Sequence, residues 1–193
     1  MKNEYYIKKC RMGKKVKEEF YNYYGYDSLF MDKFCLSKIK NNYQCICKKK
    51  RIHFPKLLEI TKRRRAYYIK STYCGKNIIE YYNLTNKEIK IDYEITKQID
   101  CIIHNLRRTD IIHMDIKKEN ICISEDETLS LIDFDRVIID LNYQKNFDVY
   151  KEFNFFFKNK DEYYINVKKS LNEMIDIKNH PRYMHQFDRG GKK

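Results

Sequence analysis

The stretch His113-Met114-Asp115-Ile116-Lys117-Lys118-Glu119-Asn120, followed 13 residues after Asn120 by Asp133-Phe134-Asp135, decides the fold of this chain. Two apolar runs, residues 121–123 and 129–132, lie between these polar segments and are separated by a polar turn. Short apolar runs bounded by turn residues are typical of β-strands. The two polar segments therefore flank a predicted pair of strands.

These segments resemble two motifs of the protein-kinase superfamily. The catalytic-loop pattern H-R-D-L-x-x-x-N is matched by HMDIKKEN, and the metal motif D-F-G by DFD, in the family's order and spacing. The resemblance covers about residues 54–160. It implies an α+β, protein-kinase-like two-lobed fold in one domain. A reduced N-lobe would span about residues 1–73, a mainly helical C-lobe about 74–180, and a tail 181–193.

The resemblance assigns a chemical role to four residues. Asp115 stands where kinases carry the aspartate that orients the attacking hydroxyl group and accepts its proton. Asn120 and Asp133 supply hard oxygen ligands of the kind that Mg²⁺ needs. Lys117 stands where Ser/Thr kinases carry a lysine that reaches the transferred phosphate. The resemblance therefore implies ATP and Mg²⁺ as cofactors, whereas the alternative interpretation is an ordinary polar loop in a chain rich in Lys, Asp and Asn.

The N-terminal part departs from the kinase pattern, because it contains no G-x-G-x-x-G. If Tyr5-Tyr6-Ile7-Lys8 is the counterpart of the kinase V-A-I-K motif, Lys8 is the phosphate-binding lysine and Glu18 or Glu19 is its partner. A surface lysine is the alternative interpretation, since several other lysines surround Lys8 in the sequence.

Two apolar runs, residues 54–60 and 66–69, are divided by the charged segment 61–65 and predict a β-hairpin. By the resemblance, this hairpin leads into the kinase hinge, where backbone groups receive adenine. An ordinary hairpin that ends in a glycine turn is the alternative. The residues expected to line the nucleotide site are Thr72, Tyr73 and Cys74.

Helical patterns occupy much of the remaining sequence. A capping box at residues 85–88, followed by isoleucines at helical spacing up to Leu106, predicts the clearest helix. One or two helices are predicted between residues 14 and 40, and two more around residues 149–157 and 164–175.

Three departures from the kinase pattern carry further expectations. Met114 replaces the arginine that recognises a phosphorylated activation loop, so regulation by such phosphorylation is not expected. Asp135 replaces glycine and limits backbone freedom at the metal motif. Asp148 follows Asp135 by only 13 positions and is expected to brace the catalytic loop. This short connection is similar to small-molecule and tRNA-modification kinases.

The composition indicates a folded, basic chain. Of 193 residues, 42% are hydrophobic, and 40 Lys and Arg against 27 Asp and Glu give a net charge of +13. No apolar run approaches the length of a membrane span, and the N-terminus is too charged for a secretory signal, so a soluble cytoplasmic protein is expected. The richness in Ile, Lys, Asn and Tyr suggests an AT-rich genome such as that of a large DNA virus, which would place the protein in host cytoplasm or in the virion.

The seven cysteines form no C-x-x-C pair and show no Cys/His spacing typical of a zinc site, so reduced thiols are expected.

Three functional classes remain open from the sequence. The leading hypothesis is a compact ATP- and Mg²⁺-dependent Ser/Thr protein kinase whose acceptor is a protein, with an atypical small-molecule or RNA-associated kinase as a variant of it. The second is a pseudokinase that acts by binding a partner protein. The third is a nucleic-acid-associated factor, which rests on the basic runs 48–51 and 62–65 alone.

Overall fold

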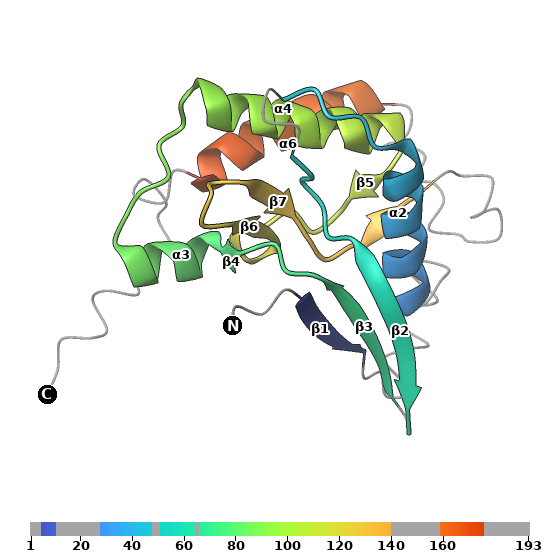
Figure 1. The fold of residues 1–193 in the computed structure, drawn as a ribbon. Coiled ribbons are helices and arrows are strands. Elements are labelled where there is room, and N and C mark those ends of the chain that lie inside the picture. The colour runs from blue at the N-terminus through green and yellow to red at the C-terminus, as the bar shows by residue number, and fades with distance from the viewer. Residues whose placement is uncertain (1–4, 11–27, 48–50, 65, 140–158, 176–193) are drawn as a thin grey trace, which may run out of the picture.

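The computed structural model describes residues 5–10, 28–47, 51–64, 66–139 and 159–175 of the chain. Over these residues the protein is a mixed α+β structure with small antiparallel sheets and four α-helices. Figure 1 shows a three-stranded sheet with one helix beside it, and the other helices gathered around a second group of short strands. The predicted α+β class is confirmed.

The first sheet consists of β1 (Tyr5–Cys10), β2 (Leu57–Arg63) and β3 (Ala66–Thr72), with β3 in the centre and antiparallel to both neighbours. The predicted hairpin is therefore confirmed, and the segment compared with the kinase V-A-I-K motif lies in β1 beside it. The prediction that the charged segment 61–65 separates the strands is wrong, because β2 continues to Arg63.

Contacts between basic and aromatic side chains explain the longer strand. Lys62 Nζ lies 5.6 Å from the ring centroid of Tyr67, and the guanidinium carbon of Arg63 lies 5.9 Å from that of Tyr68. Such cation–π contacts contribute about 0.5–1 kcal/mol each at exposed sites. The rings of β3 therefore offset the weak strand preference of charged residues, and the chain turns only at Arg64, whose φ is 54°.

Helix α2 (Ser28–Asn42) lies beside this sheet (Figure 1). One of its faces is buried in the main core, and the apolar residues of that face are Met31, Cys35, Leu36 and Ile39. Their spacing of three and four residues is that of one helix face. The helix predicted between residues 14 and 40 is thus confirmed for its second half, while residues 11–27 lie outside the described part.

The second half of the structure is organised around α4 (Tyr93–Arg108), which packs against β7 (Leu129–Leu131) and α6 (Lys160–Ile175). In Figure 1, α4 and α6 lie together over β6 and β7. The Tyr164 hydroxyl joins these parts, because it donates to the carbonyl oxygens of Leu106 and Ile111, each at 3.2 Å. The strand pair predicted at residues 121–123 and 129–132 and the helix predicted around 164–175 are confirmed.

The remaining elements are short and frame the polar segments. Strands β4 and β6 pair with each other, β6 also pairs with β7, and β5 pairs with β8, all antiparallel. These elements are β4 (Lys76–Asn77), α3 (Ile78–Thr85), β5 (Ile112–His113), the 3₁₀ turn η1 (Lys118–Asn120), β6 (Ile121–Ile123) and β8 (Val137–Ile138).

The predicted start of the clearest helix is wrong. Residues 85–88 do not cap α4: Thr85 ends α3, and its hydroxyl donates to the Tyr81 carbonyl at 2.7 Å. Asn86 then takes a left-handed conformation, which asparagine tolerates well. The N-cap of α4 is Asp92, whose carboxylate accepts from the Ile95 amide at 2.9 Å.

Gly75 joins the two halves at a point where another residue would not fit. Its φ is +100°, and a Cβ there would lie 2.1 Å from the carbonyl oxygen of Ile123. The close approach to β6 fixes the path of the chain from β3 to α3, and only glycine permits it.

Several predictions concern residues outside the described part. They are Glu18, Glu19, Asp148, the helix around 149–157 and the tail 181–193. Among the described helices, each is too short or too polar to cross a lipid bilayer.

Candidate active site

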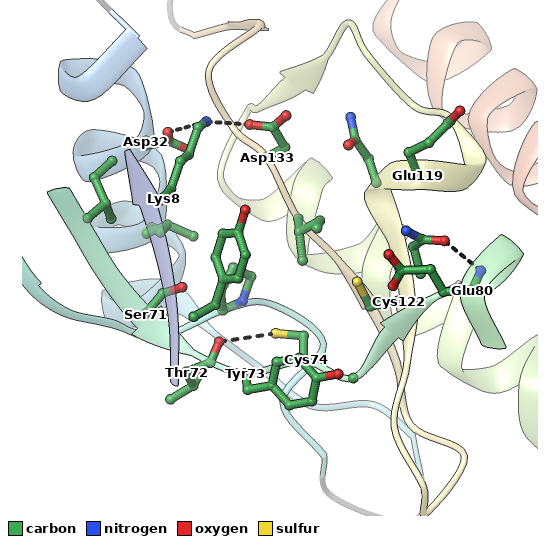
Figure 2. A pocket seen from close by; sticks show the side chains of 18 residues that line it. Lys8, Asp32, Ser71, Thr72, Tyr73, Cys74, Glu80, Glu119, Cys122 and Asp133 are labelled. Carbon is green, nitrogen blue, oxygen red and sulfur yellow. Dashed lines mark hydrogen bonds and ion pairs between the residues drawn. The ribbon is translucent and has the colours of Figure 1, made fainter. Parts of the chain in front are cut away.

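A cavity of about 330 Å³ lies between the first sheet and the strands β4 and β6. Figure 2 shows Lys8 and Asp133 at one end of it and the segment from Thr72 to Cys74 at the other. All six residues that the sequence predicted for nucleotide or metal binding line this one cavity: Lys8, Thr72, Tyr73, Cys74, Asn120 and Asp133. Asp115 and Lys117 are not in its lining and lie beyond Asn120.

Lys8 is the centre of a cluster of carboxylates. Its Nζ lies 2.7 Å from Asp32 Oδ2 and 3.3 Å from Asp135 Oδ2, and it also donates to Asp133 Oδ1. These partners come from α2 and from the segment after β7, so the lysine of β1 joins three separate parts of the chain. The described structure does not place Lys8 as a free surface lysine.

Asp32 is a site residue that the sequence analysis missed. It contacts Lys8, a contact that the sequence analysis predicted for Glu18 or Glu19. Both glutamates lie outside the described residues. Its Oδ1 also accepts from the Phe134 amide at 3.0 Å, and the residue is only 4% exposed. The sequence did contain a signal, because Asp32 is the only acidic residue of α2 and stands among the apolar positions of its buried face.

The electrostatic balance around Lys8 favours a further cation. Burial lowers the pKa of Lys8, but the charges of Asp32, Asp133 and Asp135 outweigh burial and raise it, so the ammonium stays charged. Burial raises the pKa of Asp32 to about 6 in spite of Lys8, and burial also raises that of Asp135. Three carboxylates face one ammonium, so ionisation of all three leaves an excess of negative charge.

The backbone of the metal motif is held in an unusual conformation. Asp133 has a φ of 67°, which is uncommon for a residue other than glycine and occurs often at functional sites. Phe134 anchors it: this ring is fully buried, with its centroid 5.0 Å from that of His113 and 6.0 Å from that of Phe54. The carboxylates on either side of Phe134 are therefore held toward Lys8.

The loop that carries Asp115 is ordered by its own side chains. Lys117 Nζ lies 2.6 Å from Asp115 Oδ2, and Asn120 Nδ2 donates to the Asp115 carbonyl at 2.8 Å and to Oδ2 at 3.1 Å. Burial raises the pKa of Asp115, but the hydrogen bond and charge of Lys117, the charge of Arg136 and the bond from Asn120 together lower it. Asp115 is therefore an ionised carboxylate at neutral pH.

His113 supports this loop from beneath. It is 2% exposed, and its Nε2 lies 3.1 Å from the Ile132 carbonyl, to which it donates. Its Nδ1 then accepts from the Asp115 amide at 3.3 Å. Burial lowers the pKa of His113, so the ring is neutral. The histidine therefore acts as a brace between the two polar segments.

The donor set fits a hard divalent cation. Asp133 and Asn120 bring oxygen atoms to the same cavity, which is the ligand chemistry of Mg²⁺. Asp135 adds a third candidate, since its Oδ1 is buried and has no hydrogen-bond partner among the described residues. Buried polar atoms without a partner are rare and often mark the place of a ligand.

Comparison with known proteins relates part of the chain to kinases. A stretch of 80 residues, 40% of the chain, is 30% identical to the "Hormonally up-regulated neu tumor-associated kinase" of Homo sapiens, and the protein of the same name from Pan troglodytes matches equally. The match covers only 11% of the length of these two relatives. No protein-family model matches the chain. The similarity weakly suggests a kinase-like protein, over two fifths of its length.

Proposed function

We propose that this protein is an ATP- and Mg²⁺-dependent phosphotransferase with a reduced, protein-kinase-like two-lobed fold. The observation that carries this proposal is the cluster of one lysine and three carboxylates at one end of the cavity, next to Asn120 and the Asp115 loop. The partial similarity to a kinase supports it.

The two ends of the cavity suit the two ends of a nucleotide. Thr72, Tyr73 and Cys74 line the end of the cavity where we place adenine, while Lys8 at the other end supplies a cation for phosphate oxygens. In this proposal, Mg²⁺ held by Asp133 and Asn120 neutralises phosphate charge, and Asp135 assists as a further oxygen ligand. When ATP binds, Lys8 exchanges part of its carboxylate contacts for phosphate.

Asp115 and Lys117 act on the acceptor side. The ionised Asp115 orients the acceptor hydroxyl group and accepts its proton. Lys117, which already lies against Asp115, balances the negative charge that develops on the transferred group. His113 and Asn120 hold Asp115 in place through its amide and carbonyl groups.

A protein hydroxyl group is the acceptor that we propose, because Lys117 follows the pattern of Ser/Thr kinases. The competing proposal is a pseudokinase that binds a partner protein and transfers no phosphate. The complete set of Asp115, Asn120 and Asp133 favours the enzyme.

Replacement of Asp115 by asparagine tests the enzyme directly. Transfer from labelled ATP would be measured by autophosphorylation and with acidic and basic proteins, aminoglycosides and tRNA as acceptors. Asp115→Asn keeps the shape of the side chain, so we expect ATP affinity within a few-fold of wild type and transfer reduced by about 10²–10⁴.

The matched control is Asp161→Asn, the same change on the exposed surface of α6, which should leave transfer unchanged. Equal rates for wild type and Asp115→Asn would refute the role of Asp115. A wild-type chain that binds ATP and phosphorylates no acceptor would favour the pseudokinase.

A further inference from the structure

The sequence shows no Cys/His spacing typical of a zinc site, but the fold brings three free cysteines together. Cys45, Cys47 and Cys101 place their sulfur atoms within 4.8 Å of one another. The Sγ atoms of Cys45 and Cys47 are 3.2 Å apart, and His53 Nε2 lies 3.3 Å from Cys47 Sγ. Because Cys101 is 54 positions beyond Cys47 in the sequence, no local spacing pattern could reveal this cluster.

We infer that these three cysteines and His53 form a structural zinc site. Thiolate and imidazole are the ligands that Zn²⁺ prefers, and three cysteines with one histidine are a common closed, tetrahedral set. A Zn–S bond of about 2.3 Å places the sulfur atoms of such a site about 3.8 Å apart. The Cys45 and Cys47 sulfur atoms are closer than this, at 3.2 Å, and all three sulfur atoms lie within 4.8 Å of one another. His53 Nε2 contacts Cys47 Sγ but does not belong to this 4.8 Å group, so metal binding requires the histidine and cysteine side chains to move toward a common centre.

The hydrogen bonding of His53 gives it the tautomer that a zinc ligand requires. Its Nδ1 lies 2.7 Å from the Leu129 carbonyl, and a carbonyl can only accept, so Nδ1 carries the hydrogen. The other nitrogen, Nε2, then presents its lone pair toward Cys47. Zinc-binding histidines almost always donate their second ring N–H in this way. His53 is 0% exposed, and the backbone oxygen thus fixes its tautomer without solvent.

A backbone donor also points at the sulfur of Cys101. The Ile46 amide donates to this Sγ at 3.5 Å. A neutral thiol accepts weakly, whereas a metal-bound thiolate is a charged acceptor that gains more from this donor. Cys101 is fully buried, so no water competes for its sulfur. A hydrogen bond to the neutral thiol would stabilise the fold only slightly, whereas the same bond to a thiolate would stabilise its negative charge.

The protein holds the ligand segments together independently of the sulfur atoms. Cys45 and Cys47 lie between α2 and β2, and Cys101 lies on α4. Asn105, also on α4, accepts from the Gln44 amide at 2.9 Å and donates to the Gln44 carbonyl at 3.0 Å. Zinc would strengthen this junction and release three thiol protons on binding, leaving a site with one net negative charge.

The test uses the full chain, purified with a phosphine reductant and a chelator and then freed of the chelator. Zinc content is measured by mass spectrometry, and Co²⁺ is titrated as a spectroscopic probe. We expect one equivalent of either metal, a thiolate-to-cobalt charge-transfer band and the strong visible bands of tetrahedral Co²⁺. Zinc should raise the melting temperature of the metal-free protein, because it joins α4 to the segment before β2.

Cys45→Ser and Cys101→Ser should each weaken Co²⁺ binding at least about 10-fold and remove about one third of the charge-transfer intensity. Cys45 is half-buried, so its variant remains informative if Cys101→Ser fails to fold. His53→Gln should keep that intensity and weaken binding. The control is Cys35→Ser, a cysteine as buried as Cys101 but outside the cluster.

Two results would overturn the zinc site. One is wild-type protein that binds no Co²⁺ at one equivalent, or binds it as tightly in Cys101→Ser as in Cys35→Ser. The other is a Cys45–Cys47 disulfide that persists in the reductant, seen as a mass lower by two hydrogen atoms.

Discussion

The two polar clusters of this protein, one around Lys8 and the other around Cys101, differ in chemistry, exposure and purpose. The Lys8 cluster consists of hard oxygen atoms around one ammonium and borders a cavity. The Cys101 cluster consists of soft sulfur and nitrogen atoms, and its two central residues, Cys101 and His53, are 0% exposed. An open oxygen cluster can exchange ligands during a reaction, whereas a closed sulfur cluster can only hold segments together.

The two clusters use neighbouring parts of the chain. Asp32 of the Lys8 cluster lies on α2, whereas Cys45 and Cys47 lie in the segment that follows α2 and Cys101 lies on α4. If the two clusters have separate functions, a substitution in the oxygen cluster should change ATP binding or transfer and leave metal binding at the cysteines unchanged. A substitution of a cysteine should weaken metal binding there and leave ATP binding unchanged. The predictions below test this separation.

Within the Lys8 cluster, Lys8→Met should have the largest effect. Removal of the cation that contacts three carboxylates should lower phosphoryl transfer by about 10²–10³, the usual cost of losing one electrostatic contact to a developing charge. Lys9→Met is the matched control, because Lys9 is the next residue of β1 and its Nζ lies over the Tyr68 ring at 5.6 Å. Equal transfer by the two variants would contradict the role of Lys8.

The stability conferred by Asp32 should depend on pH. Burial raises its pKa from 3.8 to about 6, so the folded state holds the proton more tightly than the unfolded state. This contribution is fully present below pH 4 and is lost as pH rises to about 6, by up to about 3 kcal/mol. The free energy of unfolding of wild type minus that of Asp32→Asn should therefore fall across this window.

Denaturant unfolding of both proteins at pH 4, 5, 6 and 7 would measure this difference, with Mg²⁺ omitted. A difference that stays constant, or that rises with pH, would contradict a raised pKa of Asp32.

Asp32→Ala should destabilise the fold more than Asp32→Asn. Alanine leaves the buried amide of Phe134 without its acceptor, which costs about 1–3 kcal/mol, while asparagine can still accept from that amide. Chemical denaturation at pH 7 would measure both variants. Equal losses would show that the Phe134 amide finds another partner. Cobalt binding should be the same in both variants, since the cysteine cluster does not include α2.

The sequence predicted the parts of the site that lie close together in the chain. Asp115, Asn120 and Asp133 were predicted from their resemblance to two kinase motifs, which one loop and two short strands hold close together. Lys8 was predicted from the comparison of four residues with the kinase V-A-I-K motif, and the structure brings it to Asp133. Asp32 was missed because its role depends on which face of α2 meets β1, and this is decided by tertiary packing.

The cysteine cluster was missed for the same reason, since the separation between Cys47 and Cys101 is closed only by the packing of α4. The wrong helix start at residues 85–88 has a local cause. Thr85 and Asp92 both carry side-chain oxygens that can cap a helix. The left-handed Asn86 ends α3 just after Thr85, so the next helix begins after Asp92.

The central claim is that the oxygen cluster binds ATP together with Mg²⁺. The most direct test is calorimetric titration of ATP into wild type and Asp133→Asn, each with and without Mg²⁺, which is omitted rather than chelated so that zinc at the cysteines is undisturbed. We predict that Mg²⁺ strengthens binding to wild type and that Asp133→Asn loses this gain. Wild-type protein without affinity for ATP, or Asp133→Asn with an undiminished response to Mg²⁺, would contradict the claim.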